Sequence, residues 1–337
     1  MKRKYVVFVL LLTGFLYACS QKEKPQPVPV IFDSDIAPDY DDVGAMALLH
    51  YFASQGDIHI LATVSSNLDS LTVPSLSVFN TWFGRPDVPV GTVKAGGARM
   101  GCSQHWSDSI TTRYPHRIRS AAEAEDAVHL YRRLLAQAED TSVVIITVGF
   151  LTNLHHLLQS PPDSFSSLDG VALVNKKVKH WVCMGGAFPA GKEFNLYVDS
   201  LASYYVLTHW PRPVIFTGYE IGSRILTGLT LVARGCEGPV KDVYRISLPY
   251  WKGDSLGRCS WDQTAVLIAA KGVSPFFNMV KGNIIIHPDG SNEWKNSEEG
   301  PHGYVVFRMS PDSLAAYIEE RMMYCGGENE HGSTTGR

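Results

Sequence analysis

Short apolar runs rich in β-branched residues alternate along the chain with longer segments of helical spacing. The runs that predict buried strands are residues 28–32, 57–66, 88–91, 142–148, 178–184 and 212–217. The segments that predict helices are residues 41–52, 70–83, 121–138, 152–159 and 262–271. Strands and helices that alternate in this way form βαβ units, which build a mostly parallel sheet covered on both faces. We therefore predict an α/β fold with an open, mostly parallel, Rossmann-like sheet and helices on both faces.

The segment near the end of the chain departs from this alternation. Within residues 284–308, the apolar runs 284–287 and 304–307 predict a small β-hairpin appended to the main fold. Because no linker or internal repeat divides the chain, we predict one domain over residues 29–325. Residues 326–337 are polar and glycine-rich, and they predict a disordered tail.

The N-terminus has the pattern of a targeting segment. Residues 1–4 are basic and residues 5–17 are apolar, a run too short to favour a membrane-spanning helix. The sequence Leu-Tyr-Ala-Cys that ends at Cys19 resembles a bacterial lipobox, which implies a signal peptide over residues 1–19 and a lipid on Cys19. Residues 20–28 have the composition of a tether. We expect an exported protein, lipid-anchored to the bacterial cell envelope on its periplasmic or surface face; a cleaved soluble secretory signal is the alternative.

Composition narrows the classes of partner. The chain has 337 residues, a formal net charge of −3 and no basic stripe, which excludes a nucleic-acid polymer as its partner. Besides Cys19 there are five cysteines without a CxxC pair, which argues against a zinc site and against a disulfide scaffold. A single isolated disulfide remains open in an oxidising compartment.

An acidic cluster follows the first predicted strand. It consists of Asp33, Asp35, Asp39, Asp41 and Asp42. Ligands of open α/β sheets bind at the carboxyl ends of strands, and like charges packed together there are costly unless a cation neutralises them. Ligands that are all oxygen point to Ca²⁺ or Mg²⁺. Two alternatives are a solvated acidic loop at a helix start and an Asp-x-Asp phosphatase, with Asp33 as phosphoryl nucleophile and Asp35 as general acid.

Several segments, taken in order, resemble the nucleoside hydrolase family of the inosine–uridine preferring type. Each match is weak alone, but together they span residues 30–266, most of the chain that would remain after cleavage. The matching segments are Asp33-Ser-Asp-Ile-Ala-Pro-Asp-Tyr-Asp-Asp42, Thr63-Val-Ser-Ser-Asn67, Val148-Gly-Phe-Leu-Thr-Asn153, Met184-Gly-Gly-Ala187 with Glu193-Phe-Asn195, and Ser260-Trp-Asp-Gln-Thr-Ala-Val266.

The resemblance implies an assignment for each site residue. The implied Ca²⁺ ligands are Asp35, Asp42, Asp262 and the backbone carbonyl of Val148. Asp35 is also the implied general base, which takes a proton from a water that the ion polarises. The implied ribose-binding residues are Asp41, Asn67, Glu193 and Asn195. Their carboxylates and amides supply the donors and acceptors that a sugar diol requires.

Two residues depart from the family pattern. Ala37 replaces the usual glycine of the first loop. Trp261 stands where the inosine–uridine type has a histidine that protonates the leaving base. A tryptophan can stack on a purine, so we place Trp261 in the catalytic site and favour purine substrates; a core indole packed under the site is the alternative. His105, Trp106 and Tyr219 are further candidates for contact with the base.

These inferences converge on one main hypothesis. We predict a calcium-dependent ribonucleoside hydrolase that releases base and ribose for purine salvage. The rival of a different class is a lipoprotein that binds a nucleoside or sugar without catalysis. Members of the family are commonly homo-oligomers, and no segment of the sequence identifies an interface.

Overall fold

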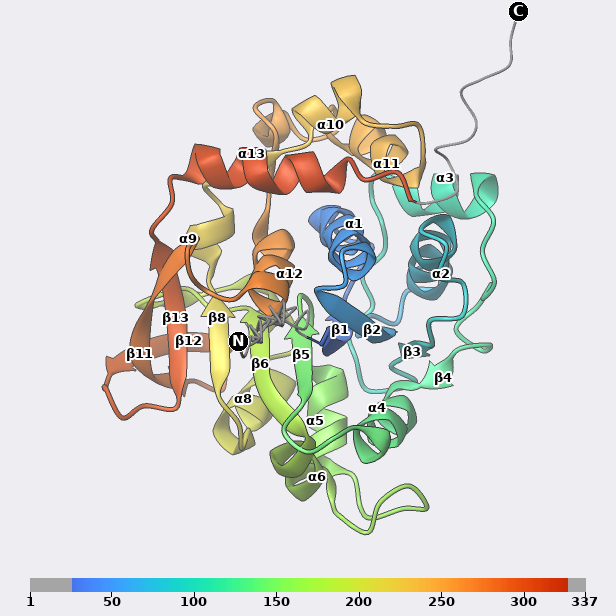
Figure 1. Cartoon of the computed structure of the whole chain (residues 1–337). Coiled ribbons are helices and arrows are strands. Elements are labelled where there is room, and N and C mark those ends of the chain that lie inside the picture. The colour runs from blue at the N-terminus through green and yellow to red at the C-terminus, as the bar shows by residue number, and fades with distance from the viewer. Residues whose placement is uncertain (1–25, 327–337) are drawn as a thin grey trace, which may run out of the picture.

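A sheet of 11 strands forms the centre of the protein, with helices on both sides (Figure 1). The computed structural model describes residues 26–326. The strand order is β4-β3-β2-β1-β5-β6-β8-β13-β11-β12-β7, and every pair from β4 to β13 is parallel. The parallel strands before β13 are β1 (Val28–Ser34), β2 (Ile58–Ser65), β3 (Val90–Thr92), β4 (Glu125–Asp126), β5 (Val143–Thr147), β6 (Val178–Met184) and β8 (Val214–Thr217). The predicted α/β fold with a mostly parallel sheet is confirmed.

Beyond β8, four strands complete this sheet, and the pairs among them are antiparallel. They are β13 (His302–Phe307), β11 (Phe277–Ile286), β12 (Ser291–Asn296) and β7 (Ala190–Lys192). Ile284 lies opposite Trp294, and Tyr304 lies opposite Val280, so the two apolar runs of the expected hairpin both belong to a larger antiparallel unit. The strand between them was not predicted because its sequence, Ser-Asn-Glu-Trp-Lys-Asn, is almost entirely polar.

Two apolar cores lie on the two faces of the sheet. The helices that contribute to the first core are α1 (Asp41–Ser54), α2 (Thr72–Trp82), α3 (Trp106–Arg113), α9 (Tyr219–Gly222), α10 (Leu229–Arg234), α11 (Pro239–Ser247), α12 (Trp261–Lys271) and α13 (Pro311–Met322). Those of the second core are α4 (Ala127–Gln137), α5 (Thr152–Gln159), α6 (Gly170–Lys177), α7 (Phe194–Val198) and α8 (Ser200–His209). Apolar side chains on both faces explain why the strands are continuous hydrophobic runs.

Helix α1 is buried over nearly its whole length and packs against α12. Both helices begin at the edge of the sheet where β1, β5 and β6 end, because their first residues line one cavity with Asp35, Val148 and Met184. The loops after these adjacent strands therefore meet the first turns of two helices. A small second sheet, β9 (Leu226–Thr227) with β10 (Arg258–Cys259), and a 3₁₀ turn at Lys252–Asp254 lead into α12.

A disulfide joins Cys236 to Cys325, which are 89 residues apart with Cα atoms 5.9 Å from each other. It attaches the segment after α13 to the loop between α10 and α11. The predicted signal peptide, Cys19, residues 20–25 of the tether and residues 327–337 of the tail lie outside the described residues. Between residues 26 and 326, the model contains no helix with the length and hydrophobicity needed to cross a membrane.

Candidate active site

A cavity of about 280 Å³ opens at the carboxyl ends of the central strands. The walls come from the loops after β1, β5 and β6, from α9, and from the segment that begins α12. The residues that line this cavity are Asp35, Asp39, Asp41, Asp42, Val148, Met184, Glu193, Phe194, Asn195, Tyr219, Arg258, Trp261 and Asp262.

All four expected metal ligands, Asp35, Asp42, Val148 and Asp262, line this one cavity and are buried. Burial, and next the charge of Asp42, holds the pKa of Asp35 well above its usual range. Burial and the charges of Asp41 and Asp42 do the same to the pKa of Asp262. Burial raises the pKa of Asp42 to about 7, although Ser34 donates a hydrogen bond of 2.5 Å to it. Each raised pKa expresses first the cost of burying a negative charge, to which neighbouring carboxylates add at Asp35 and Asp262.

The donor set fits a hard divalent ion. Three buried carboxylates and a backbone carbonyl offer oxygen atoms alone, which suits Ca²⁺ or Mg²⁺ and disfavours softer metals. Among residues 26–326, no group of three or more His, Cys, Asp or Glu side chains has the arrangement of a formed metal site. The carboxylates share the cavity walls without being gathered around one point.

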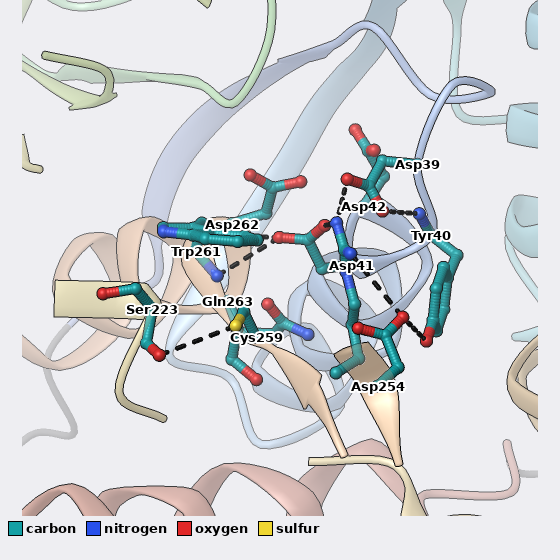
Figure 2. Close-up of polar contacts among 12 residues, drawn as sticks. Asp39, Tyr40, Asp41, Asp42, Ser223, Asp254, Cys259, Trp261, Asp262 and Gln263 are labelled. Carbon is teal, nitrogen blue, oxygen red and sulfur yellow. Dashed lines mark hydrogen bonds and ion pairs between the residues drawn. The ribbon is translucent and has the colours of Figure 1, made fainter. Parts of the chain in front are cut away.

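Asp41 joins the start of α1 to the start of α12 (Figure 2). Its Oδ2 accepts hydrogen bonds from the backbone N–H groups of Trp261, at 3.2 Å, and Asp262, at 3.3 Å. These N–H groups belong to the first turn of α12, where they have no partner within the helix and where the helix dipole also favours an anion. Burial, followed by the charge of Asp42, raises the pKa of Asp41 well above its usual range.

Arg258 is a site residue that the sequence analysis missed. Its guanidinium forms ion pairs with Asp39 and, at 3.2 Å, with Asp41. It also lies 5.0 Å from the ring centroid of Tyr40 and 5.2 Å from that of Trp261. Burial lowers the pKa of Arg258 to about 10, which leaves it charged at neutral pH. One feature of the sequence could have identified it as a site residue: this arginine lies three positions before the Trp-Asp motif, in a segment that must approach the acidic loop.

Glu193 and Asn195 occupy the wall formed after β6. The Glu193 carboxylate accepts hydrogen bonds from the backbone N–H groups of Asn195, at 2.8 Å, Gly186, at 3.1 Å, and Leu196, at 3.3 Å. It thereby caps the short helix α7 while facing the cavity. Burial raises the pKa of Glu193 to about 7. The Asn195 amide donates to the carbonyl of Met184 at 3.2 Å, which leaves its side-chain oxygen for a ligand.

Asn67 lies behind the cavity wall, in contrast to the expected ribose contact. Its amide group donates to the carbonyl oxygens of Asp35, at 2.9 Å, and Met100, at 2.8 Å. Its side-chain oxygen accepts from the N–H groups of Asp69 and Met100. With these bonds formed and no place on the cavity lining, Asn67 positions the backbone of Asp35.

Asp33 also lies behind the cavity. Its carboxylate accepts a hydrogen bond of 2.9 Å from the Tyr131 hydroxyl and bonds of 3.1 Å from the amide of Asn153. A phosphoryl nucleophile must face the substrate, and Asp33 does not line the cavity. The position of Asp33 therefore argues against the Asp-x-Asp phosphatase.

Trp261 and Tyr219 form an aromatic wall of the cavity. Their rings stack with centroids 5.5 Å apart and an interplanar angle of 28°. The indole Nε1–H of Trp261 donates to the backbone carbonyl of Tyr219 at 2.8 Å, which fixes the orientation of the indole ring. Of the three further aromatic candidates, Tyr219 alone reaches the cavity, because His105 is exposed outside it and Trp106 is buried in the core.

Comparison with known proteins identifies the family. The profile of the inosine-uridine preferring nucleoside hydrolases matches residues 30–280. The chain belongs to this family. This nucleoside hydrolase is thus an N-glycosyl hydrolase, and members of its family generally use a divalent metal ion. Comparison with curated protein sequences gives no match.

Solved structures of two nucleoside hydrolases and of an effector protein share the fold. A plant nucleoside hydrolase has 19% identity and a TM-score of 0.66, over 88% of this chain and 99% of the other. The purine-preferring ribonucleoside hydrolase of Gardnerella vaginalis has 17% identity and a TM-score of 0.69, over 88% and 98%. The effector protein XOO4466 has 13% identity and a TM-score of 0.68, over 89% and 94%.

Proposed function

We propose that this nucleoside hydrolase uses Ca²⁺ to hydrolyse the N-glycosidic bond of ribonucleosides, with purines preferred. The observation that carries the proposal is the convergence of the expected ion ligands and of Glu193 and Asn195 on one buried cavity. The residues that converge on this cavity come from distant parts of the chain, since Asp35 and Asp262 are more than 200 positions apart in the sequence. A cavity of about 280 Å³ at strand ends suits a single small molecule.

The chemistry of the proposal assigns roles to the buried carboxylates. Ca²⁺ held by Asp35, Asp42, Asp262 and the carbonyl of Val148 would lower the pKa of a water molecule at the site. Asp35 accepts the proton of the attacking water as general base.

The ribose-binding part of the proposal uses three of the four expected residues. Asp41, Glu193 and Asn195 line the cavity and offer oxygen acceptors to sugar hydroxyls. Glu193 and Asp41 are held by backbone N–H groups, so their carboxylates are oriented before substrate arrives. Negative charge around the sugar would also stabilise the positive charge that develops on the ring in the transition state. Asn67 supports this arrangement through the backbone of Asp35.

Purine preference rests on the aromatic wall. The wide faces of Trp261 and Tyr219 suit stacking on a bicyclic base better than on a single ring. The similar structure from Gardnerella vaginalis is that of a purine-preferring ribonucleoside hydrolase, which is in line with the proposal.

The test is base release from a panel of purine and pyrimidine ribonucleosides by the domain over residues 27–337, with and without a calcium chelator. We expect chelator-sensitive release that Ca²⁺ restores, and higher kcat/KM for purines. Asp35→Asn, which removes the general base, should be folded and inactive. Tight binding of nucleosides without product would overturn the hydrolytic proposal and favour a binding protein.

We further propose that the protein is exported and lipid-anchored through Cys19. The Cys236–Cys325 disulfide supports export, because such bonds persist in oxidising compartments. Growth with a fatty acid that can be labelled should mark the wild-type chain and leave Cys19→Ser unlabelled. A label on both chains, or on neither, would contradict a lipid on Cys19.

A further inference from the structure

The cavity has a strong excess of acidic groups. Six of its lining side chains are carboxylic acids, namely Asp35, Asp39, Asp41, Asp42, Glu193 and Asp262. Arg258 is the cationic side chain on the described lining, and its guanidinium is engaged by Asp39 and Asp41. A divalent ion would not balance the remaining negative charge. A cavity lined by one sign of charge concentrates ligands of the opposite sign.

The aromatic wall is suited to a cation as well. The ring of Tyr219 stacks on Trp261 and is 53% exposed, and Phe194 is 36% exposed at the rim. The Arg258 guanidinium, 5.2 Å from the centroid of Trp261, shows that a ring of this wall accepts a cation, and the exposed ring of Tyr219 is the face that remains for a substrate. Contact of a cation with such a ring stabilises binding by about 0.5–2 kcal/mol.

Proton donors for a departing base are scarce on the same wall. The described lining contains no histidine or lysine. The Nε1–H of Trp261 is committed to the carbonyl of Tyr219, and Arg258 to its carboxylate partners. The hydroxyl of Tyr219 is the remaining O–H group on the aromatic wall, while the carboxyl groups serve the ion and the ribose in the proposed function. A neutral base that needs a ring proton as it leaves therefore receives little help.

We propose that the preferred substrates are N-ribosides whose base carries a fixed positive charge, such as N7-alkylated purinium and pyridinium ribosides. The inference rests on the proposed function and specifies its substrate class. Water forms a bond to C1′ and gives its proton to Asp35. The C1′–N bond breaks, and both of its electrons go to the ring, where they cancel the positive charge. The base departs neutral, so no proton donor is required.

The test compares N7-methylguanosine with guanosine at about pH 6, where N1 of the methylated base keeps its proton and the two nucleosides differ by one methyl group and one charge. For the wild-type enzyme with Ca²⁺, we expect kcat/KM to be at least about tenfold higher for the cation. Tyr219→Phe keeps the ring face and should keep the ratio. Tyr219→Leu removes the face and should lower the ratio by about threefold or more, in line with the strength of cation–π contacts.

Salt provides a measurement that does not depend on a variant. Raising the ionic strength from about 0.05 M to 0.5 M shortens the range of electrostatic attraction severalfold. The KM for N7-methylguanosine should rise by at least threefold, while the KM for guanosine should stay within twofold.

Three results would each contradict the proposed preference for cationic nucleosides. Equal or better hydrolysis of guanosine overturns the proposed preference and leaves the hydrolase function intact. A high ratio that is the same in Tyr219→Leu and unaffected by salt also overturns it, because the ratio then reflects the weaker bond of the methylated nucleoside. No release from either nucleoside, or from any ribonucleoside of the panel, removes the proposed function as well.

Discussion

The Arg258 guanidinium lies 3.2 Å from the carboxylate of Asp41, which in turn accepts hydrogen bonds from the first N–H groups of α12. This connection joins the acidic loop before α1 to the Trp-Asp start of α12. The position of Asp41 in the cavity therefore depends on a residue that is distant in sequence and that has no assigned part in the reaction.

Replacement of Arg258 by methionine should weaken both stability and catalysis. Removal of one partner from a buried ion pair costs about 3–5 kcal/mol, because the other charge stays buried. We expect kcat/KM for nucleosides to fall about 10- to 100-fold, equivalent to about 1.4–2.7 kcal/mol, with a smaller loss in Arg258→Lys. Steady-state kinetics and urea unfolding would measure both. Lys176→Met, which removes an exposed ion pair with Asp140, is the matched control and should change neither.

Asp33 and Asp35 should respond in opposite ways to substitution by asparagine. In Asp33→Asn, an amide group would face the donors of Tyr131 and Asn153, so we expect a loss of about 1–3 kcal/mol of stability. Asp35→Asn removes a charge from a repulsive cluster, so the fold should hold while turnover is lost. Thermal unfolding and initial rates distinguish the two. Full activity in Asp35→Asn with none in a folded Asp33→Asn would reverse the assigned roles.

A methyl group on Gly222 should displace Trp261. A Cβ at this position would lie 2.3 Å from the Cα of Trp261, a distance that requires the backbone to move. We expect Gly222→Ala to lower kcat/KM for purine nucleosides at least tenfold. Gly253→Ala is the control, because a Cβ there meets nothing within 4 Å. Equal activity of the two variants would show that the position of Trp261 does not matter for turnover.

His50 should make the protein less stable in mild acid. It is buried, lies 3.1 Å from the Asn80 side-chain oxygen and stacks on Phe83. Burial, and next the charge of Arg85, lowers the pKa of His50 to about 3. The unfolded chain binds a proton here below about pH 6.5, whereas the folded chain does not until about pH 3. Stability from this group is therefore complete above pH 6.5 and falls by up to about 1.4 kcal/mol per pH unit as the pH is lowered towards 3.

Urea unfolding at pH 7, 6 and 5 would measure this dependence. We expect the slope of unfolding free energy against pH to be smaller in His50→Gln than in the wild type, by close to one proton. Parallel slopes in the two proteins would contradict the assignment.

Reduction of the Cys236–Cys325 disulfide should lower stability without removing activity. The bond closes a long loop between residues 89 positions apart, and such cross-links contribute about 2–4 kcal/mol. Neither cysteine lines the cavity. Differential scanning calorimetry with and without a reductant should show a lower melting temperature after reduction, and the double variant with Ala at both positions should not respond to the reductant. If the melting temperature of that variant also falls after reduction, the loss of stability does not come from the Cys236–Cys325 bond.

The sequence predicted the parallel sheet and most of the cavity because both follow from local patterns. Apolar runs mark the strands; Asp35 lies three positions after the first run and Val148 ends the run over residues 142–148, so the topology brings them together. Arg258 was missed because its role depends on the tertiary approach of β10 to the acidic loop, which no periodicity encodes. The family resemblance implied a ribose contact for Asn67, and a resemblance does not show which hydrogen bonds the side chain already makes to the backbone.

The direction of β1 bears on how an anchored molecule would be oriented. The strand enters the sheet at Val28 and reaches the cavity edge at Ser34, about 20 Å further along. Val28 therefore lies at the end of β1 remote from the cavity. With a lipid on Cys19, as proposed, the anchored segment would join the domain at that end, apart from the loops that would bind substrate.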